Sequence, residues 1–151
     1  MAVTVRPARS DDREVVKRLL GEFIEYLNAI EPSDAAVDLD ILLDQSFGPD
    51  PVCRTLIAEA GGRPVGYISF HPGVWEIWRS IYVISLFVGA EARGTGAGRA
   101  LMDAVKEIAR AQQAQRIVWE VWRKNPLAIG FYQGIGGEVF DENLRMSLVV
   151  E

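Results

Sequence analysis

The fold is decided by one stretch of the sequence, Val83-Ile-Ser-Leu-Phe-Val-Gly-Ala-Glu-Ala-Arg-Gly-Thr-Gly-Ala-Gly-Arg-Ala-Leu-Met102. An apolar run over 81–88 stops at Gly89, a glycine-rich segment follows, and a helix-forming run comes next. This pattern predicts a buried strand, a loop and a helix N-terminus. Such a junction directs unpaired backbone N–H groups and the positive end of a helix dipole toward one point, and glycines let a bulky anion approach. The stretch therefore predicts an anion-binding loop, and a glycine-rich turn without a ligand is the plainer alternative.

The glycine spacing argues against two familiar phosphate-binding motifs. A nucleotide P-loop requires Gly-x-x-x-x-Gly-Lys-Ser/Thr, and no lysine follows these glycines. In a dinucleotide fingerprint Gly94 and Gly96 would fit, but Arg99 occupies the place of the third glycine. Glu120 falls where a ribose-binding acid would lie, yet the residues after it leave room for only about one more helix. A second mononucleotide-binding half therefore does not fit.

Two other motifs match in order and separation. The first is Arg-x-x-Gly-x-Gly, at Arg93, Gly96 and Gly98. The second is Asn-x-x-Ala-x-x-Phe-Tyr-x-x-x-Gly, at Asn125, Ala128, Phe131, Tyr132 and Gly136. With a strand before the first motif and a helix after it, nearly the whole chain resembles the GCN5-related N-acetyltransferase (GNAT) superfamily.

The resemblance implies that the cofactor is acetyl-coenzyme A (acetyl-CoA). In that family the glycine loop wraps the pyrophosphate, and the pantetheine arm lies between two splayed strands, here the strand ending at Val88 and the one starting near Ile117. The arm pairs with the main chain of the first strand, in the manner of strand addition at a sheet edge. The implied cofactor contacts are Leu86, Phe87, Val88, Arg93, Gly94, Thr95, Gly96, Ala97, Gly98, Arg99, Asn125, Ala128, Phe131 and Tyr132.

Acetyl transfer to an amine requires a neutral amine, a stabilised oxyanion and a proton for the leaving thiolate. An alkyl amine has a pKa near ~10.4, so a base is useful at neutral pH. By resemblance, the Tyr132 hydroxyl faces the sulfur as the acid, and a backbone N–H near Phe87 or Val88 serves the oxyanion. Glu120 is the predicted catalytic base, and Glu22, Glu25 and Glu31 near the acceptor side are alternative candidates for this role. His71, which precedes Pro72, is interpreted as a turn residue.

Within the superfamily, the segments 42–48, 56–59 and 81–88 resemble the diamine and polyamine acetyltransferases. That branch carries an acidic pair where this chain has Ile84 and Ser85. Deprotonation is therefore expected to rely on water or on a remote carboxylate. We expect a small, cationic primary amine as acceptor, because several acids cluster around the first inter-helix turn. The predicted substrate contacts are Glu22, Glu25, Tyr26, Glu31, Ser85 and Trp122.

Other functions stay open at this point. The lost acidic pair permits a non-catalytic acyl-CoA-binding module, and an acetyltransferase for protein or peptide amines is a further alternative. The tryptophans at 75, 78 and 122 could wall an acceptor pocket by cation–π contact or form a homodimer interface.

The composition of the 151 residues sets outer limits on the protein class. The net charge of −5 argues against a nucleic-acid partner. No apolar run is long enough for a membrane span, and the N-terminus lacks a signal-peptide pattern. The single cysteine, Cys53, excludes an internal disulfide. These features predict one cytoplasmic domain over 1–151, with no metal site.

The periodicity along the chain predicts a mixed α/β (α+β) fold. Strands are expected at 3–6, 55–60, 65–70, 81–88 and 117–121, and a final hairpin from 139–140 and 146–150. Helices are expected after an N-cap at Ser10, around 39–43, and over 99–112 and 127–135. A hairpin set followed by a βαβ unit implies a mixed, mostly antiparallel central sheet with helices on both faces. The resemblance predicts the same element order.

Overall fold

The computed structural model describes residues 2–151. The chain divides into two compact units, one running through Glu120 and the other spanning 121–151. Among the described residues, no helix combines the length and the apolar character that crossing a membrane requires.

The first unit contains a five-stranded sheet with the strand order β1-β2-β3-β4-β5. Neighbouring strands are antiparallel from β1 to β4, whereas β4 and β5 are parallel. The predicted mixed, mostly antiparallel sheet is therefore confirmed. The strands are β1 (Val3–Pro7), β2 (Arg54–Ala60), β3 (Arg63–Trp75), β4 (Trp78–Val88) and β5 (Arg116–Trp119).

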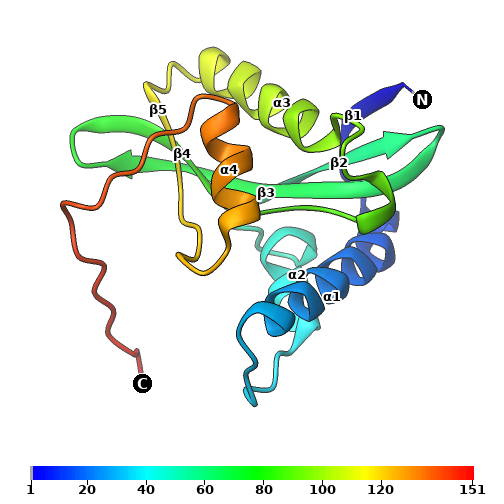
Figure 1. Ribbon diagram of the computed structural model, residues 1–151, viewed down its shortest axis with the longest axis horizontal. Coiled ribbons are helices and arrows are strands. Elements are labelled where there is room, and N and C mark those ends of the chain that lie inside the picture. Colours follow the sequence, from blue (N-terminus) through cyan, green and yellow to red (C-terminus); the bar gives the residue numbers. More distant parts are fainter. Residues whose placement is uncertain (1) are drawn as a thin grey trace. The chain divides into compact units, whose positions relative to one another are not determined.

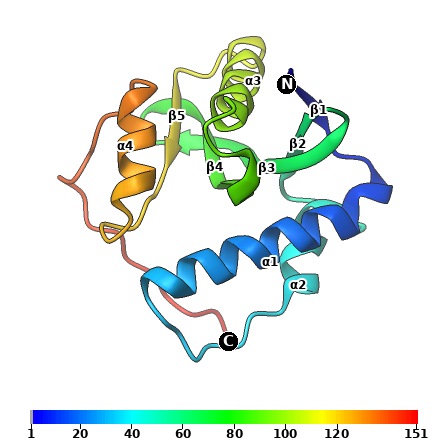
Figure 2. The ribbon, with the colours of Figure 1, turned by 45° about the vertical axis from the view of Figure 1, so that its right-hand side comes forward.

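Helices cover both faces of this sheet (Figure 1, Figure 2). Helices α1 (Arg13–Ile30) and α2 (Leu39–Phe47) lie on one face, and α3 (Ala97–Ala111) lies on the other. Helix α1 ends two residues before Pro32, and Asp38 caps α2 by accepting hydrogen bonds from the N–H groups of Asp40 and Ile41. On the α1 side, fully buried Leu19 packs with Tyr67 and Phe87. The core thus joins α1 to β3 and to the C-terminal end of β4.

Strand β3 is longer than the sequence predicted. Pro72 and Gly73 were expected to end it, but β3 continues to Trp75 and pairs with β4 along this extension, Pro72 opposite Ile81. Strand β2 pairs with β3 only as far as Phe70, so Pro72 lies where β3 has no β2 partner. An edge position tolerates proline because no ladder hydrogen bond needs its missing N–H. A tight hairpin turn at 76–77 joins β3 to β4, and His71 lies within a strand rather than in the predicted turn.

A bulge interrupts β4 at Ile84. Ser85 is opposite Ser69 and Val83 is opposite Phe70, so Ile84 has no partner on β3. Side chains alternate along β3, so Tyr67, Ser69 and His71 project from the same face. Their partners on β4 are Phe87, Ser85 and Tyr82. Because of the bulge, all three β4 residues share the α1 face although Tyr82 is an odd number of positions away from the other two.

The start of α1 differs from the prediction of an N-cap at Ser10. Residues Ser10–Asp12 form a 3-10 turn before α1. The Asp12 carboxylate accepts the Arg9 N–H at 2.6 Å and two hydrogen bonds from the Arg6 guanidinium. These bonds lower the pKa of Asp12 to about 2. A carboxylate bound by an arginine of β1 satisfies this helix start better than a serine hydroxyl would.

The second unit contains α4 (Pro126–Gly134). The predicted hairpin from 139–140 and 146–150 is wrong, because these described residues form no strand. Leu148 and Val150 are 89% and 92% exposed, so they have no packed surface to cover. A short apolar segment becomes a strand only when a partner strand supplies the hydrogen bonds of the ladder.

Candidate functional site

The glycine-rich loop between β4 and α3 is open and exposed. Gly94 and Gly96 have φ values of +79° and +89°, in the left-handed region that favours glycine. A Cβ at either position would meet no atom within 4 Å, so it would project into the space in front of the loop. Helix α3 begins at Ala97, so the N–H groups of Ala97, Gly98 and Arg99 have no partner inside the helix. This geometry fits a phosphate-bearing ligand approaching the helix N-terminus.

The strand before this loop has one open edge. Strand β5 pairs only with Ser80–Val83 of β4, through its own residues Arg116–Trp119. The two strands therefore cease to pair after Val83. Within residues 2–151, β4 has a sheet partner only on the β3 side from Ile84 onward.

Alternation along β4 decides which main-chain groups face that open edge. Gly89 donates its N–H to Val65 of β3 at 2.8 Å. In an antiparallel ladder every second residue bonds to the same neighbour, so the main chain of Phe87 is also directed toward β3. The groups of Leu86 and Val88 are directed away from it. Of the three predicted main-chain contacts, Leu86 and Val88 are the better placed, and the Phe87 ring belongs to the core.

Arg93 of the loop contacts residues of α1 and β4. Its guanidinium lies 5.1 Å from the Tyr26 ring centroid and 5.9 Å from that of Phe87, and its Nε donates to the Val88 carbonyl at 3.3 Å. Phe87 also stacks on Phe23 at 5.3 Å. Tyr26, predicted to bind the acceptor, thus contacts the arginine of the glycine loop. Thr95 steadies the loop from within, because its hydroxyl donates to the Ala92 carbonyl at 2.5 Å.

Glu120 lies where β4 and β5 separate. The last paired residues are Val83 and Trp119, and the Tyr82 hydroxyl donates to Glu120 Oε1 at 3.0 Å across this point. The His71 ring lies beside Tyr82, with 5.4 Å between ring centroids. The structure therefore brings Glu120 together with Tyr82, which was not predicted to act with it.

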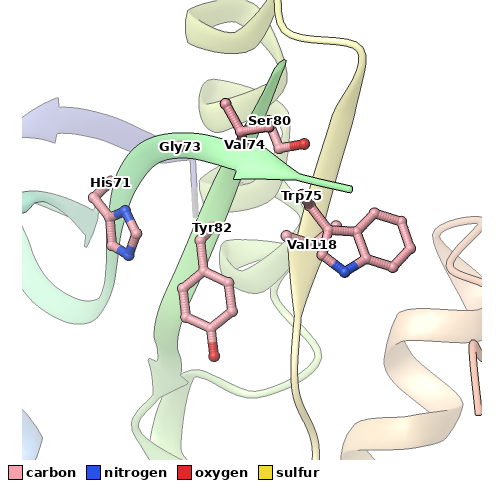
Figure 3. Close-up of a pocket in the computed structure, with 7 residues that line it drawn as sticks. All are labelled: His71, Gly73, Val74, Trp75, Ser80, Tyr82 and Val118. Carbon is pink, nitrogen blue, oxygen red and sulfur yellow. The ribbon is translucent and has the colours of Figure 1, made fainter. Parts of the chain in front are cut away.

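Tyr82 and His71 line a hollow of about 240 Å³ on the sheet (Figure 3). Both side chains project to the same side of the strands, and the Trp75 indole lies next to Val118 of β5. The lining residues are His71, Gly73, Val74, Trp75, Ser80, Tyr82 and Val118.

Other predicted acceptor residues have separate surroundings. Ser85 is half-buried and donates to the Tyr67 hydroxyl at 3.1 Å, while burial raises the pKa of Tyr67 to about 12. Glu22 pairs with Arg18 at 2.9 Å on α1. Glu25 and Glu31 are exposed near the end of the same helix. None of the three acids contacts the hollow in the described structure.

In the second unit, α4 forms as the second motif predicted. The Asn125 side chain accepts the Ala128 N–H at 3.2 Å, and Pro126 occupies the first helical position. Phe131 and Tyr132 contact edge to face, with their ring centroids 5.3 Å apart. Burial raises the pKa of Tyr132 to about 12, so its hydroxyl keeps its proton at neutral pH. Trp122, predicted to bind the acceptor, is exposed in the same unit.

The sequence reasoning missed Tyr82. The feature that could have indicated it is the polar phenol hydroxyl of Tyr82 within the mostly aliphatic run 81–88. Its partner Glu120 is 38 positions away, and only the parallel register of β4 and β5 brings the two together.

Comparison with known proteins agrees with this architecture. Residues 17–136 match the model of the Acetyltransferase (GNAT) family. A thialysine N-epsilon-acetyltransferase from Bos taurus is 28% identical over 150 residues, which cover 93% of this chain and 86% of that protein.

Solved structures share the fold. The ribosomal-protein-alanine N-acetyltransferase of Brucella melitensis biovar Abortus 2308 has a TM-score of 0.78 at 19% identity, over 97% of this chain and all of that one. An aminoglycoside acetyltransferase from an uncultured soil metagenomic sample, in complex with sisomicin, has a TM-score of 0.74 at 11% identity, over 99% of this chain and 97% of that one. These two proteins are named for different acceptors, so the shared fold does not identify an acceptor. What the family match does establish is that this chain belongs to the acetyltransferase (GNAT) family.

Proposed function

We propose that the chain is an N-acetyltransferase that uses acetyl-CoA and transfers acetyl to a primary amine of a small, cationic acceptor. The observation that carries this proposal is the loop at 93–99. Its two left-handed glycines leave open space in front of the N-terminus of α3, directly after a strand with an open edge. A diphosphate would fit at the loop, and an extended amide-bearing arm would fit along the edge.

The donor side involves mainly main-chain groups. The N–H groups of Gly94 to Arg99 would hold the pyrophosphate, and Leu86 and Val88 would pair with the arm. When bound, acetyl-CoA supplies an acetyl group on a thioester. The Val88 N–H is directed toward the open edge and is our candidate for the oxyanion.

The reaction requires two proton transfers. The amine nitrogen forms a bond to the carbonyl carbon as the carbon–sulfur bond breaks. Glu120, directly or through water, accepts the proton that the amine loses. Tyr132 donates a proton to the departing thiolate, a role that family resemblance suggests. Because burial raises the pKa of Tyr132 to about 12, the hydroxyl carries its proton at neutral pH.

The proposed acceptor class follows from the relatives. The Bos taurus relative is named for the ε-amine of thialysine, and it aligns with this chain over most of its length. A short chain ending in a primary ammonium would suit a protein with a net charge of −5. We therefore propose thialysine and similar side-chain amines as acceptors.

The test is a thiol-release assay with acetyl-CoA, joined to mass analysis of the product. The acceptors are thialysine, lysine, 1,5-diaminopentane and an alanine-terminated peptide. We expect thiol release with an acetylated product for the small cationic amines. Binding of acetyl-CoA without transfer to any amine would instead indicate a non-catalytic acyl-CoA-binding module. A preference for the peptide would reject the small-acceptor proposal.

A further inference from the structure

Three side chains from different elements meet at the glycine-rich loop: Arg93 of the loop, Tyr26 of α1 and Phe87 of β4. We infer that Tyr26 is a positioning residue, which together with Phe87 holds the Arg93 guanidinium in place for the pyrophosphate of the donor. Donor binding would then depend on a residue of α1. The inference rests on the proposed use of acetyl-CoA and gives Tyr26 a role on the donor side, where the sequence predicted an acceptor contact.

The core of the first unit holds the two rings beside Arg93. Phe87 is only 6% exposed and stacks on Phe23 of α1, with 5.3 Å between ring centroids and an interplanar angle of 10°. Tyr26 follows Phe23 by three positions, so both rings lie on the same face of α1. The centroid of Tyr26 is 6.5 Å from that of Phe87. The two rings are therefore in place before any ligand binds.

Arg93 lies against both rings although its side chain is exposed. Its guanidinium carbon is 5.1 Å from the Tyr26 centroid and 5.9 Å from the Phe87 centroid, within the ~6 Å reach of a cation–π attraction. Its Nε also donates to the Val88 carbonyl at 3.3 Å. An arginine has many rotamers, and these contacts favour the few that keep the charge beside the loop.

Most hydrogen-bond donors of Arg93 remain for an anion. A guanidinium carries five N–H donors, and the bond to Val88 uses one of them. Within residues 2–151, Arg93 makes no other hydrogen bond or ion pair. The two terminal NH₂ groups can therefore bind phosphate oxygens. Arg93 directly precedes Gly94, so its charge and the backbone N–H groups of the loop serve the same ligand group.

Holding the arginine in advance should strengthen donor binding. A side chain that moves freely loses conformational entropy when an anion immobilises it. The contacts with Tyr26 and Phe87 remove part of this loss from the binding step, which is the general effect of preorganisation. Removing the ring at position 26 should therefore weaken acetyl-CoA binding even though Tyr26 acts only through Arg93.

The first experiment measures the Kd of acetyl-CoA by calorimetry. Tyr26→Leu should raise Kd by about threefold to tenfold, the size that a cation–π contact supports. Tyr26→Phe is the matched control, because it keeps the ring and deletes only the hydroxyl, and its Kd should stay within about twofold of the wild type. Tyr26→Met is a second variant without a ring, and thermal unfolding selects the folded variants. Equal Kd values for ring-free and ring-bearing variants would overturn the inference.

The second experiment repeats the titration in an Arg93→Gln background. With no guanidinium to position, Tyr26→Leu should change Kd by less than about twofold in this background, because the two changes remove the same interaction. Arg93 is exposed, so Arg93→Gln should remain folded. A loss of threefold or more on adding Tyr26→Leu would show that Tyr26 acts without Arg93.

The third experiment separates a donor role from an acceptor role. S-acetylpantetheine carries the acetyl group but lacks the pyrophosphate, so it makes no use of Arg93 at the loop. With saturating thialysine, the ratio of kcat/KM for acetyl-CoA to kcat/KM for S-acetylpantetheine should fall by about threefold to tenfold in Tyr26→Leu and stay unchanged in Tyr26→Phe. An unchanged ratio in Tyr26→Leu, with both activities lowered, would assign Tyr26 to the acceptor and overturn the inference.

The two proposals fail in different ways. Wild-type protein that binds acetyl-CoA but transfers acetyl to no amine overturns the proposed function, and the calorimetric experiments still test the role of Tyr26. Wild-type protein that acetylates thialysine while Tyr26→Leu binds acetyl-CoA as Tyr26→Phe does overturns only the positioning role.

Discussion

Replacing Gly96 by valine should abolish tight acetyl-CoA binding while leaving the protein folded. Gly96 has a φ of +89°, and a Cβ there would project into open space rather than into protein. The valine side chain would therefore stand where the pyrophosphate is proposed to reach the backbone N–H groups.

A control variant should lose about as much folding stability as Gly96→Val. Gly62, in the β2–β3 turn, has a φ of +77° and equally open surroundings. A left-handed conformation costs an L-residue roughly 1–2 kcal/mol. Gly62→Val and Gly96→Val should therefore lose similar stability, and a domain of ordinary stability, about 5–15 kcal/mol, would tolerate either loss.

The binding cost should separate the two variants. A hydrogen bond from a backbone N–H to a charged group contributes about 1.5–3 kcal/mol. Loss of two such bonds to the pyrophosphate would remove at least about 3 kcal/mol, or on the order of a hundredfold in Kd. Gly62→Val should bind acetyl-CoA as the wild type does.

Calorimetric titration with acetyl-CoA measures Kd, and thermal unfolding confirms that both variants are folded. If the two variants bind acetyl-CoA with the same Kd, the loop at 93–99 does not hold the pyrophosphate. If Gly96→Val is unfolded while Gly62→Val is folded, this result contradicts the expectation that a side chain at position 96 projects into open space.

Three further predictions concern the proton donor and the stability of the first unit. Tyr132→Phe should lower kcat by about 10²–10⁴-fold with little change in acetyl-CoA affinity, measured by steady-state kinetics and calorimetry, and a loss below about threefold would assign the proton to another group. Because the pKa of Tyr132 is raised to about 12, the wild-type rate should not fall between pH 7 and 10, and a decline there would contradict its role as the acid. The pKa of Asp12 is lowered from 3.8 to about 2, mainly by its hydrogen bonds with Arg6. The ionised carboxylate should therefore stabilise the fold by about 2 kcal/mol above pH 4, and this stabilisation should be lost as the pH falls through 2. Urea unfolding of Asp12→Asn should show the full difference from wild type at pH 7 and only about a third of it at pH 2.5, where the folded-state carboxyl with a pKa of about 2 has begun to take up its proton.

The glycine-rich loop and the start of α4 could be predicted because their signals are local. The glycines at 94 and 96 adopt the conformations that only glycine adopts easily, and Asn125 with Pro126 starts α4 as the sequence indicated. The element order up to α4 followed from periodicity, and the resemblance agreed with it.

What the sequence did not predict depends on contacts between distant segments. A proline usually ends a strand. Pro72 does not end β3, because the pairing of β2 with β3 stops at Phe70 and no hydrogen bond to β2 is needed at Pro72. His71 was therefore misplaced in a turn. The bond from Tyr82 to Glu120 requires the β4–β5 register, which no local pattern encodes. The mostly apolar residues at 146–150 predicted a strand, but a strand needs a partner that the pattern alone does not supply.

The bulge at Ile84 acts as a phase shift within a single strand. The one unpaired residue separates β4 into a half that ends in Tyr82 and Val83 and a half that begins with Ser85. Each half keeps its own alternation, so a residue gained or lost at the bulge would exchange inward and outward side chains in one half relative to the other. Substitutions in the half of β4 that ends at Val83 can therefore change that part of the sheet surface. The pairing of the other half with β3, which directs the main chain of Leu86 and Val88 to the open edge, stays the same. A family that keeps one donor and varies its acceptors would benefit from such a division.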